Sequence, residues 1–307
     1  MTLTELKYIV AVARERHFGR AAEACFVSQP TLSVAIKKLE DELDVKIFER
    51  GVSEVSVTPL GEQIVRQAQQ VIEQAQAIRE IAKRGKDPVS GPLRLGIIYT
   101  IGPYLLPDLV RLAIERVPQM PLVITENFTA KLLEHLRTGE IDCAIMAEPF
   151  PDTGLAVAPL YDEPFQAAVP RSHPLARRKT VTAEELKNET MLLLGTGHCF
   201  RDHVLEVCPE YARFSSDAEG IRKSFEGSSL ETIKYMVASG MGITVVPQLS
   251  VPRDKSPHVK YIKFAEPVPT RRVVLAWRRT FTRYEAIAAL RNAIYACPLQ
   301  GVKRLRD

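Results

Sequence analysis

The pattern of apolar and polar positions is most informative over residues 17–61, where it predicts two helices joined by a tight turn. Small residues from Ala21 to Ala24 predict a slim first helix, and the turn falls near Phe26 and Val27. Ser28 can cap the second helix, whose first turn tolerates Pro30. Apolar side chains then recur every three or four residues and predict a buried stripe formed by Leu32, Ala35, Ile36, Leu39 and Leu43. A hairpin-like wing follows over residues 50–57.

The opposite face of the second helix carries side chains suited to DNA. A glutamine can pair with an adenine edge, hydroxyls reach bases or phosphates, and lysines neutralise phosphates. An amphipathic helical hairpin with a solvated polar face is the alternative interpretation, but the local signals agree in order and spacing. We therefore expect DNA contacts from Gln29, Pro30, Thr31, Ser33, Lys37 and Lys38, with Arg50 at the start of the wing.

A long helix is predicted from Leu60 onward, because apolar residues alternate at steps of three and four. This spacing is typical of a coiled-coil seam, and it favours dimerisation over a solitary surface helix. The sequence GKDPVSGP, residues 85–92, then breaks the helix and predicts a hinge. The seam consists of Leu60, Ile64, Ala68, Val71, Ala75, Ile78 and Ala82.

Beyond the hinge, short apolar strands alternate with helical segments. This order predicts an α/β fold with a parallel sheet and covering helices. Crossover strands near residues 161–170 and 261–266 divide it into two lobes, with a cleft where ligands commonly bind. The strands are expected at residues 93–99, 122–127, 143–147, 190–195, 242–247 and 273–278, and the helices at residues 103–116, 131–138, 230–239 and 284–296.

These motifs resemble those of LysR-type transcriptional regulators. The N-terminal match includes SQPTLS at Ser28 to Ser33 and TPLG at Thr58 to Gly61, although Glu54 stands where such wings often hold a basic residue. The C-terminal match includes HLRTGEIDCAIM at 135–146 and VASGMGITVVP at 237–247. The resemblance covers nearly the whole chain.

The resemblance implies a winged helix-turn-helix over residues 1–59, a dimerisation helix over 60–84, a hinge over 85–92 and a regulatory domain over 93–307. Within the regulatory domain we expect lobe I at about 93–161 plus 267–307 and lobe II at about 162–266. This two-lobed α/β form is similar to that of periplasmic binding proteins.

Composition changes this picture only in detail. A chain of 307 residues with 46% hydrophobic content can hold two or three domains. Residues 1–50 contain 8 Lys and Arg against 8 Asp and Glu, so attraction to DNA must come from the arrangement of charges despite the net +4 of the whole chain. We interpret the acidic run Glu40, Asp41, Glu42 and Asp44 as a solvated face. Neither a signal peptide nor a membrane span is recognisable, which predicts a cytoplasmic protein without membrane contact.

Five cysteines, an odd number, argue against a structural disulfide framework. Cys25, Cys143 and Cys297 lie in apolar patterns and are expected to be buried packing residues. Cys199 differs, because the sequence GTGHCFRDHVLEVC, residues 195–208, places it at the start of a predicted helix. A helix N-terminus favours the thiolate, as do neighbouring cations such as Arg201 and His198.

A thiolate at Cys199 could react with peroxide to form a sulfenic acid, and Cys208 is the candidate thiol to condense with it. Nine residues of helix separate their α-carbons by about 13 Å, whereas a disulfide requires roughly 7 Å or less. Bridging them would therefore force the intervening segment to refold.

Three alternatives compete with this interpretation. His198, Cys199, His203 and Cys208 could bind zinc, although their spacing follows no compact metal motif. Both thiols could be inert packing residues. A thiol peroxidase is the third alternative, but a DNA-binding segment fits an enzyme poorly.

Within the LysR family, the chain resembles the OxyR-type hydrogen-peroxide sensors in GHC at Gly197 to Cys199, in Arg201 and in Cys208. The resemblance implies that Cys199 is the peroxidatic and Cys208 the resolving cysteine. It further implies that the hydroxyls of Thr100 and Thr129 hold peroxide, while His198 and Arg201 polarise or stabilise the site.

The expected protein is thus a transcription activator of peroxide defence and not an enzyme, with no cofactor and no metal. Its implied partners are double-stranded DNA, RNA polymerase and further copies of itself, as a dimer of dimers, with hydrogen peroxide as effector. A LysR-type regulator that answers a small metabolite between the lobes is the alternative. A cleft-binding transport protein would share the two-lobed form but would have no use for residues 1–60.

Overall fold

A computed structural model describes the chain except for residues 51–54, 84–88, 152–153, 214–223, 228, 255 and 306–307. The chain divides into two compact units. The first comprises Met1–Pro88 with Glu134–Ile141 and Arg278–Tyr284, and the second comprises Val89–Leu133, Asp142–Trp277 and Glu285–Asp307. Among the described residues, no helix is both long enough and apolar enough to cross a membrane.

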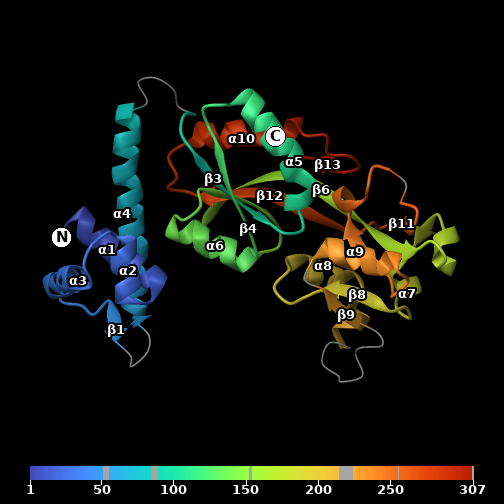
Figure 1. Ribbon diagram of the computed structural model, residues 1–307, viewed down its shortest axis with the longest axis horizontal. Coiled ribbons are helices and arrows are strands. Elements are labelled where there is room, and N and C mark those ends of the chain that lie inside the picture. Colours follow the sequence, from blue (N-terminus) through green and yellow to red (C-terminus); the bar gives the residue numbers. More distant parts are fainter. Residues whose placement is uncertain are drawn as a thin grey trace. The chain divides into compact units, whose positions relative to one another are not determined.

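The N-terminal part is a helix-turn-helix with a two-stranded wing (Figure 1). A capping box between Thr2 and Glu5 starts the first helix. Strands β1 and β2 pair antiparallel. The elements are α1 (Leu3–Glu15), α2 (Phe18–Ala24), α3 (Gln29–Leu43), β1 (Phe48–Arg50), β2 (Val55–Val57) and α4 (Pro59–Lys83).

The turn between α2 and α3 forms where the sequence predicts it. Phe26 adopts a left-handed φ of 55°, and the Ser28 hydroxyl accepts a hydrogen bond from the backbone N–H of Thr31. The predicted stripe is buried at Leu32, Ile36 and Leu39. Its last member, Leu43, is 37% exposed, because α3 ends there and the chain turns away through Asp44.

The interpretation of the acidic run as a solvated face is wrong for Glu40. Only 8% of this residue is exposed. Its Oε1 accepts hydrogen bonds from the backbone N–H groups of Ile47 (2.7 Å) and Phe48 (3.1 Å), and Lys46 lies 3.4 Å from Oε2. The carboxylate therefore satisfies amides where the chain enters the wing, a role that helical spacing alone does not reveal.

Part of the apolar seam of α4 packs against the core of its own unit. Ala68 is buried in the N-terminal core, and Ile64 and Ile72 pack against that core. Leu60, Val71 and Ile78 of the seam are exposed. Dimerisation through the exposed part stays a prediction, and residues 85–88 of the predicted hinge lie outside the described residues.

The second unit is built on a nine-stranded sheet whose main order is β4-β3-β5-β12-β6-β11-β7, with β10 and β13 also paired to β6. Strand β6 is 16 residues long and extends from one lobe into the other (Figure 1). The strands are β3 (Leu93–Ile98), β4 (Leu122–Asn127), β5 (Cys143–Ala147), β6 (Leu155–Pro170), β7 (Thr180–Val181), β10 (Thr244–Pro247), β11 (Val259–Phe264), β12 (Thr270–Arg278) and β13 (Lys303–Arg304).

Helices and short turns accompany these strands, and a separate parallel pair is formed by β8 (Met191–Leu194) and β9 (Ser224–Gly227). The helices are α5 (Gly102–Arg116), α6 (Thr129–Thr138), α7 (Ala183–Leu186), α8 (Cys199–Val207), α9 (Leu230–Ala238) and α10 (Tyr284–Ala296), with 3₁₀ turns η1 (Pro174–Arg177), η2 (Pro209–Arg213) and η4 (Gln248–Ser250).

The expected parallel sheet is instead mixed. Strand β3 pairs parallel with β4 and β5, as predicted. Strand β12 pairs antiparallel with β5, and β10 and β11 pair antiparallel with β6. The chain passes from one lobe to the other within β6 and returns between β11 and β12, so neighbouring strands run in opposite directions. The alternation of strands and helices along the sequence does not indicate where the chain crosses between the lobes.

Candidate redox site and DNA-binding face

Cys199 is the first residue of α8, as the sequence predicts. Strand β8 ends at Leu194, and a short turn leads to His198, which is the N-cap residue. Gly197 in this turn has a φ of +99°, and a Cβ at this position would lie 3.4 Å from the ring of Phe128. Glycine therefore permits both the left-handed backbone and the close approach of that ring.

A small cavity lies at the N-terminal end of α8, next to Cys199 and the carboxyl ends of β3 and β4. Its volume of about 10 Å³ matches the space for the centre of a single water molecule. Hydrogen peroxide is of comparable size, whereas an organic metabolite does not fit. The lining residues are Ile98, Tyr99, Thr100, Asn127, Phe128, Thr129, Gly197, His198 and Cys199.

Three aromatic rings meet at this cavity. The His198 ring lies 4.8 Å from the Phe128 ring and 5.9 Å from the Tyr99 ring, in edge-to-face arrangements. His198 is buried despite its polar ring. Tyr99 and Phe128 were not singled out from the sequence, and their only signal there is their position at the ends of two strands. They form part of the cavity wall.

Thr100 is held in place by a buried arginine. It is 3% exposed, and its Oγ1 accepts a hydrogen bond of 2.8 Å from Arg271 Nη1. Arg271 also donates to the Thr100 carbonyl and pairs with Glu163 at 2.8 Å. Because Oγ1 acts as acceptor toward Arg271, its O–H remains a donor. Neither Arg271 nor Glu163 follows from the sequence pattern.

Thr129 presents a buried hydroxyl to the same cavity. Its Oγ1 has no hydrogen-bond partner among the described residues. A buried polar atom without a partner is costly and marks a place where a small polar molecule would be held. The two threonines named from the resemblance are thus brought together with Cys199 and His198.

Arg201 occupies a different place from the other expected site residues. It does not line the cavity, and its Nη1 donates to the carbonyl of Leu194 at the end of β8. The side chain is buried. Its observed contact fixes the start of α8 against the strand that leads into it.

Cys208 lies at the opposite end of α8, as the C-cap residue, and is fully buried in the core of lobe II. Burial, with a smaller contribution from the charge of Glu210, raises the pKa of its thiol to about 12. None of the five cysteines forms a disulfide. Since α8 is continuous, its nine residues hold the two α-carbons about 13 Å apart.

The alternative of a zinc site gains no support. Among the residues that the structure describes, no group of three or more His, Cys, Asp or Glu side chains could hold a metal ion. The His203 ring instead hydrogen-bonds the Glu148 carbonyl at 2.8 Å. Burial is the main cause that lowers the pKa of His203.

The expected DNA contacts share the outer face of α3. Ser33 is half-buried, and Lys38 Nζ forms an ion pair with Glu5 at 3.9 Å. The side chain of Arg50 and the whole of Glu54 lie outside the described residues. The exposed members are Gln29, Pro30, Thr31, Lys37 and Lys38.

Comparison with known families matches both parts of the chain. The family described as "Bacterial regulatory helix-turn-helix protein, lysR family" matches residues 3–62, and the family described as "LysR substrate binding domain" matches residues 86–296.

Individual relatives are similar over almost the full length. A "Hydrogen peroxide-inducible genes activator" of Pectobacterium carotovorum subsp. carotovorum is 40% identical over 292 residues, covering 94% of this chain and 95% of the relative. The "DNA-binding transcriptional dual regulator OxyR" of Escherichia coli K12 is 39% identical, covering 94% of each. The structure of full-length OxyR C199D from Pseudomonas aeruginosa is 51% identical with a TM-score of 0.80, covering 97% of this chain and 98% of that chain.

Proposed function

This chain belongs to the LysR family of bacterial helix-turn-helix regulators, and from that premise we propose that it senses hydrogen peroxide through Cys199 and activates oxidative-stress defence genes. The observation that carries the proposal is the one-water cavity that holds Cys199 beside Thr100, Thr129 and His198. A cavity of this size fits peroxide beside Cys199, whereas a larger organic effector would not fit there.

The chemistry requires two steps. The Cys199 thiolate attacks one peroxide oxygen, the O–O bond breaks, and the leaving hydroxide takes a proton to become water. The hydroxyls of Thr100 and Thr129 line the cavity and hydrogen-bond the bound peroxide, and the His198 side chain forms another part of the wall. The sulfur is now a sulfenic acid.

In the second step the Cys208 thiolate attacks the Cys199 sulfur, the S–O bond breaks, and a second water leaves. The resulting disulfide needs α-carbons within roughly 7 Å. Because α8 holds them about 13 Å apart, the helix must unwind and the Cys208 side chain must leave the core. Oxidation is thereby converted into a change of fold.

The DNA-binding part makes this change a transcriptional signal. Helix α3 enters the major groove with Gln29, Pro30, Thr31, Ser33, Lys37 and Lys38, and Arg50 contacts the phosphate backbone from the wing. The protein acts as a dimer of dimers through α4 and the effector domains, in the cytoplasm and together with RNA polymerase. Cys199 is consumed stoichiometrically, so the protein is a regulator and not a peroxidase.

Titration of the reduced full-length chain with stoichiometric hydrogen peroxide tests the proposal, with free thiols and the DNA footprint measured on the same samples. We expect two of the five thiols to disappear and the footprint to shift. Cys199→Ser should abolish both effects, whereas Cys25→Ser, which removes a half-buried thiol elsewhere, should still show the loss of two thiols. An unchanged footprint in the oxidised wild-type chain would contradict the proposal.

A further inference from the structure

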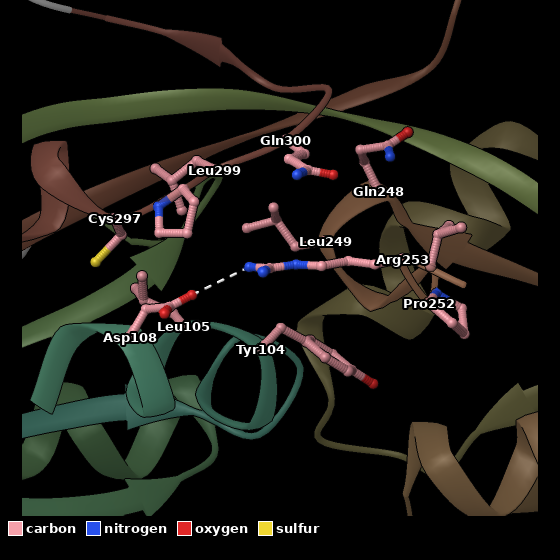
Figure 2. A pocket seen from close by; sticks show the side chains of 12 residues that line it. Tyr104, Leu105, Asp108, Gln248, Leu249, Pro252, Arg253, Cys297, Leu299 and Gln300 are labelled. Atoms are coloured by element: carbon pink, nitrogen blue, oxygen red, sulfur yellow. Dashed lines mark hydrogen bonds and ion pairs between the residues drawn. The ribbon is translucent and has the colours of Figure 1, made fainter. Parts of the chain in front are cut away.

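A second cavity, of about 160 Å³, lies between α5, the η4 turn and the segment that follows α10 (Figure 2). It shares no lining residue with the Cys199 cavity. Its walls are mostly polar. The side chains that define its chemistry are Tyr104, Asp108, Gln248, Arg253 and Gln300.

The cavity contains one charge of each sign. Figure 2 shows the Arg253 side chain reaching across the space toward Asp108, and the two pair at 3.2 Å. The arginine side chain is 64% exposed, and an ion pair so open to water contributes at most about 1 kcal/mol. A ligand that brings its own carboxylate and ammonium group can therefore replace each partner at little cost.

Two amides complete the recognition surface. The side chains of Gln248 and Gln300 lie on the same side of Arg253 (Figure 2). Gln248 is held by Gln166, whose Nε2 donates to Gln248 Oε1 at 2.6 Å, so its amide is fixed in the cavity wall. Amides that both donate and accept fit a ligand with a polar, uncharged end.

Size limits the ligand further. The cavity is more than ten times as large as the roughly 10–15 Å³ that admits one water molecule, so it has room for a small organic molecule. We propose that it binds a free polar α-amino acid of glutamine's size, with its carboxylate on Arg253, its ammonium group on Asp108 and its side chain against Gln248 and Gln300.

A buried chain of hydrogen bonds connects this cavity to the redox site. The backbone N–H of Leu249, in the cavity wall, donates to Glu163 Oε1 at 2.8 Å. Glu163 Oε2 accepts from Arg271, which in turn donates to Thr100 Oγ1 at 2.8 Å. An amino acid that fixes η4 therefore fixes Thr100 beside Cys199. This regulatory consequence depends on the proposed function, whereas binding itself does not.

Calorimetric titration of the reduced full-length chain with L-glutamine tests binding. Arg253→Gln and Asp108→Asn should each weaken it about tenfold or more, because each removes a charge-assisted contact. N-acetyl-L-glutamine lacks the ammonium charge, so it should bind the wild-type chain as weakly as L-glutamine binds the Asp108→Asn variant. Arg116→Gln, which removes an exposed charge from the same helix α5 outside the cavity, should bind like the wild type. Absence of binding heat at millimolar L-glutamine, or equal affinity in Arg253→Gln, overturns the proposal.

The rate at which peroxide consumes the Cys199 thiol tests the regulation. Saturating L-glutamine should raise it about fivefold, at the lower end of typical allosteric couplings, and the increase should be absent in Arg253→Gln. An unchanged rate in the presence of measured binding overturns the coupling alone. Absence of oxidation under both conditions overturns the proposed function together with the coupling and leaves the binding result standing.

Discussion

At the residue scale, the two threonines of the redox cavity have unequal surroundings. Arg271 holds the hydroxyl of Thr100, whereas that of Thr129 has no partner among the described residues. The Thr129 hydroxyl therefore has both its donor and its acceptor sites open to peroxide. Its loss should affect the reaction while leaving the protein's own hydrogen bonds intact.

Thr129→Val keeps the shape of the side chain and removes the hydroxyl. We expect it to slow oxidation of Cys199 about tenfold, the effect of one hydrogen bond worth roughly 1.4 kcal/mol in the transition state. Stopped-flow measurement of thiol loss checks this. Thr180→Val, at an exposed position in β7, should leave the rate unchanged. Equal rates for Thr129→Val and the wild type would mean that this hydroxyl does not hold peroxide.

The Cys208 thiol imposes an order on the two oxidation steps. Burial raises its pKa to about 12, so within the folded core it is a neutral thiol and a poor nucleophile. Attack on the Cys199 sulfenic acid therefore follows exposure of Cys208 to water. Disulfide formation is limited by opening of the segment, because the thiol becomes reactive only outside the core.

At the element scale, the contacts that hold α8 in place oppose formation of the disulfide. Arg201 binds the end of β8, His203 binds the Glu148 carbonyl, and the Phe200 ring packs 5.1 Å from that of Phe165. All these contacts lie between the two cysteines of the pair. The free energy of docking α8 is what oxidation must overcome.

Protonation of His203 should weaken this docking. Burial lowers its pKa, so as the pH falls below about 6.5 the unfolded chain takes up a proton before the folded one does. Stability is therefore lost as the pH falls from about 6.5 toward the folded pKa. His203→Gln should lose less stability between about pH 7 and pH 5 than the wild type, as measured by urea unfolding of the reduced chain.

His258→Gln serves as the control for this pH dependence, because it replaces an exposed histidine. It should lose as much stability over the same interval as the wild type. If His203→Gln also behaves like the wild type, protonation at this position is not linked to folding.

At the scale of the whole molecule, we expect α4 to pair with the same helix of a second copy. Its seam residues near the N-terminal core are already packed, and Ile78 farther along is 69% exposed. An apolar side chain so exposed at a coiled-coil position is explained by a second helix against it. Paired recognition helices then match paired half-sites on DNA.

Ile78→Asp should weaken this pairing, because it places a charge in an apolar seam. We expect the variant to dissociate at a concentration at least tenfold above that of the wild type, as measured by analytical ultracentrifugation, and its footprint to shorten. Gln76→Asp introduces the same charge at an exposed position outside the seam and should associate normally. Unchanged association of Ile78→Asp would place the dimer interface elsewhere.

The sequence by itself determined the features that depend on neighbours along the chain. The start of α3 at Ser28, the turn at Phe26 and the start of α8 at Cys199 follow from caps, glycines and helical periodicity, which act within a few residues. The separation of Cys199 from Cys208 follows in the same way, since helix length fixes it. Motif resemblance added Thr100, Thr129 and His198, which the fold brings to one cavity.

Tertiary structure alone decided which distant groups meet. Arg271 lies 171 residues from the Thr100 hydroxyl to which it donates, and no local pattern encodes such a pairing. The position of Glu40 along its helix predicts a solvated side chain. Its carboxylate instead accepts hydrogen bonds from two backbone N–H groups where the chain enters the wing. The mixed sheet likewise depends on the chain crossing between the lobes within β6 and returning between β11 and β12. Periodicity indicates which side of a helix or strand is buried, whereas long-range packing determines which other element covers that side.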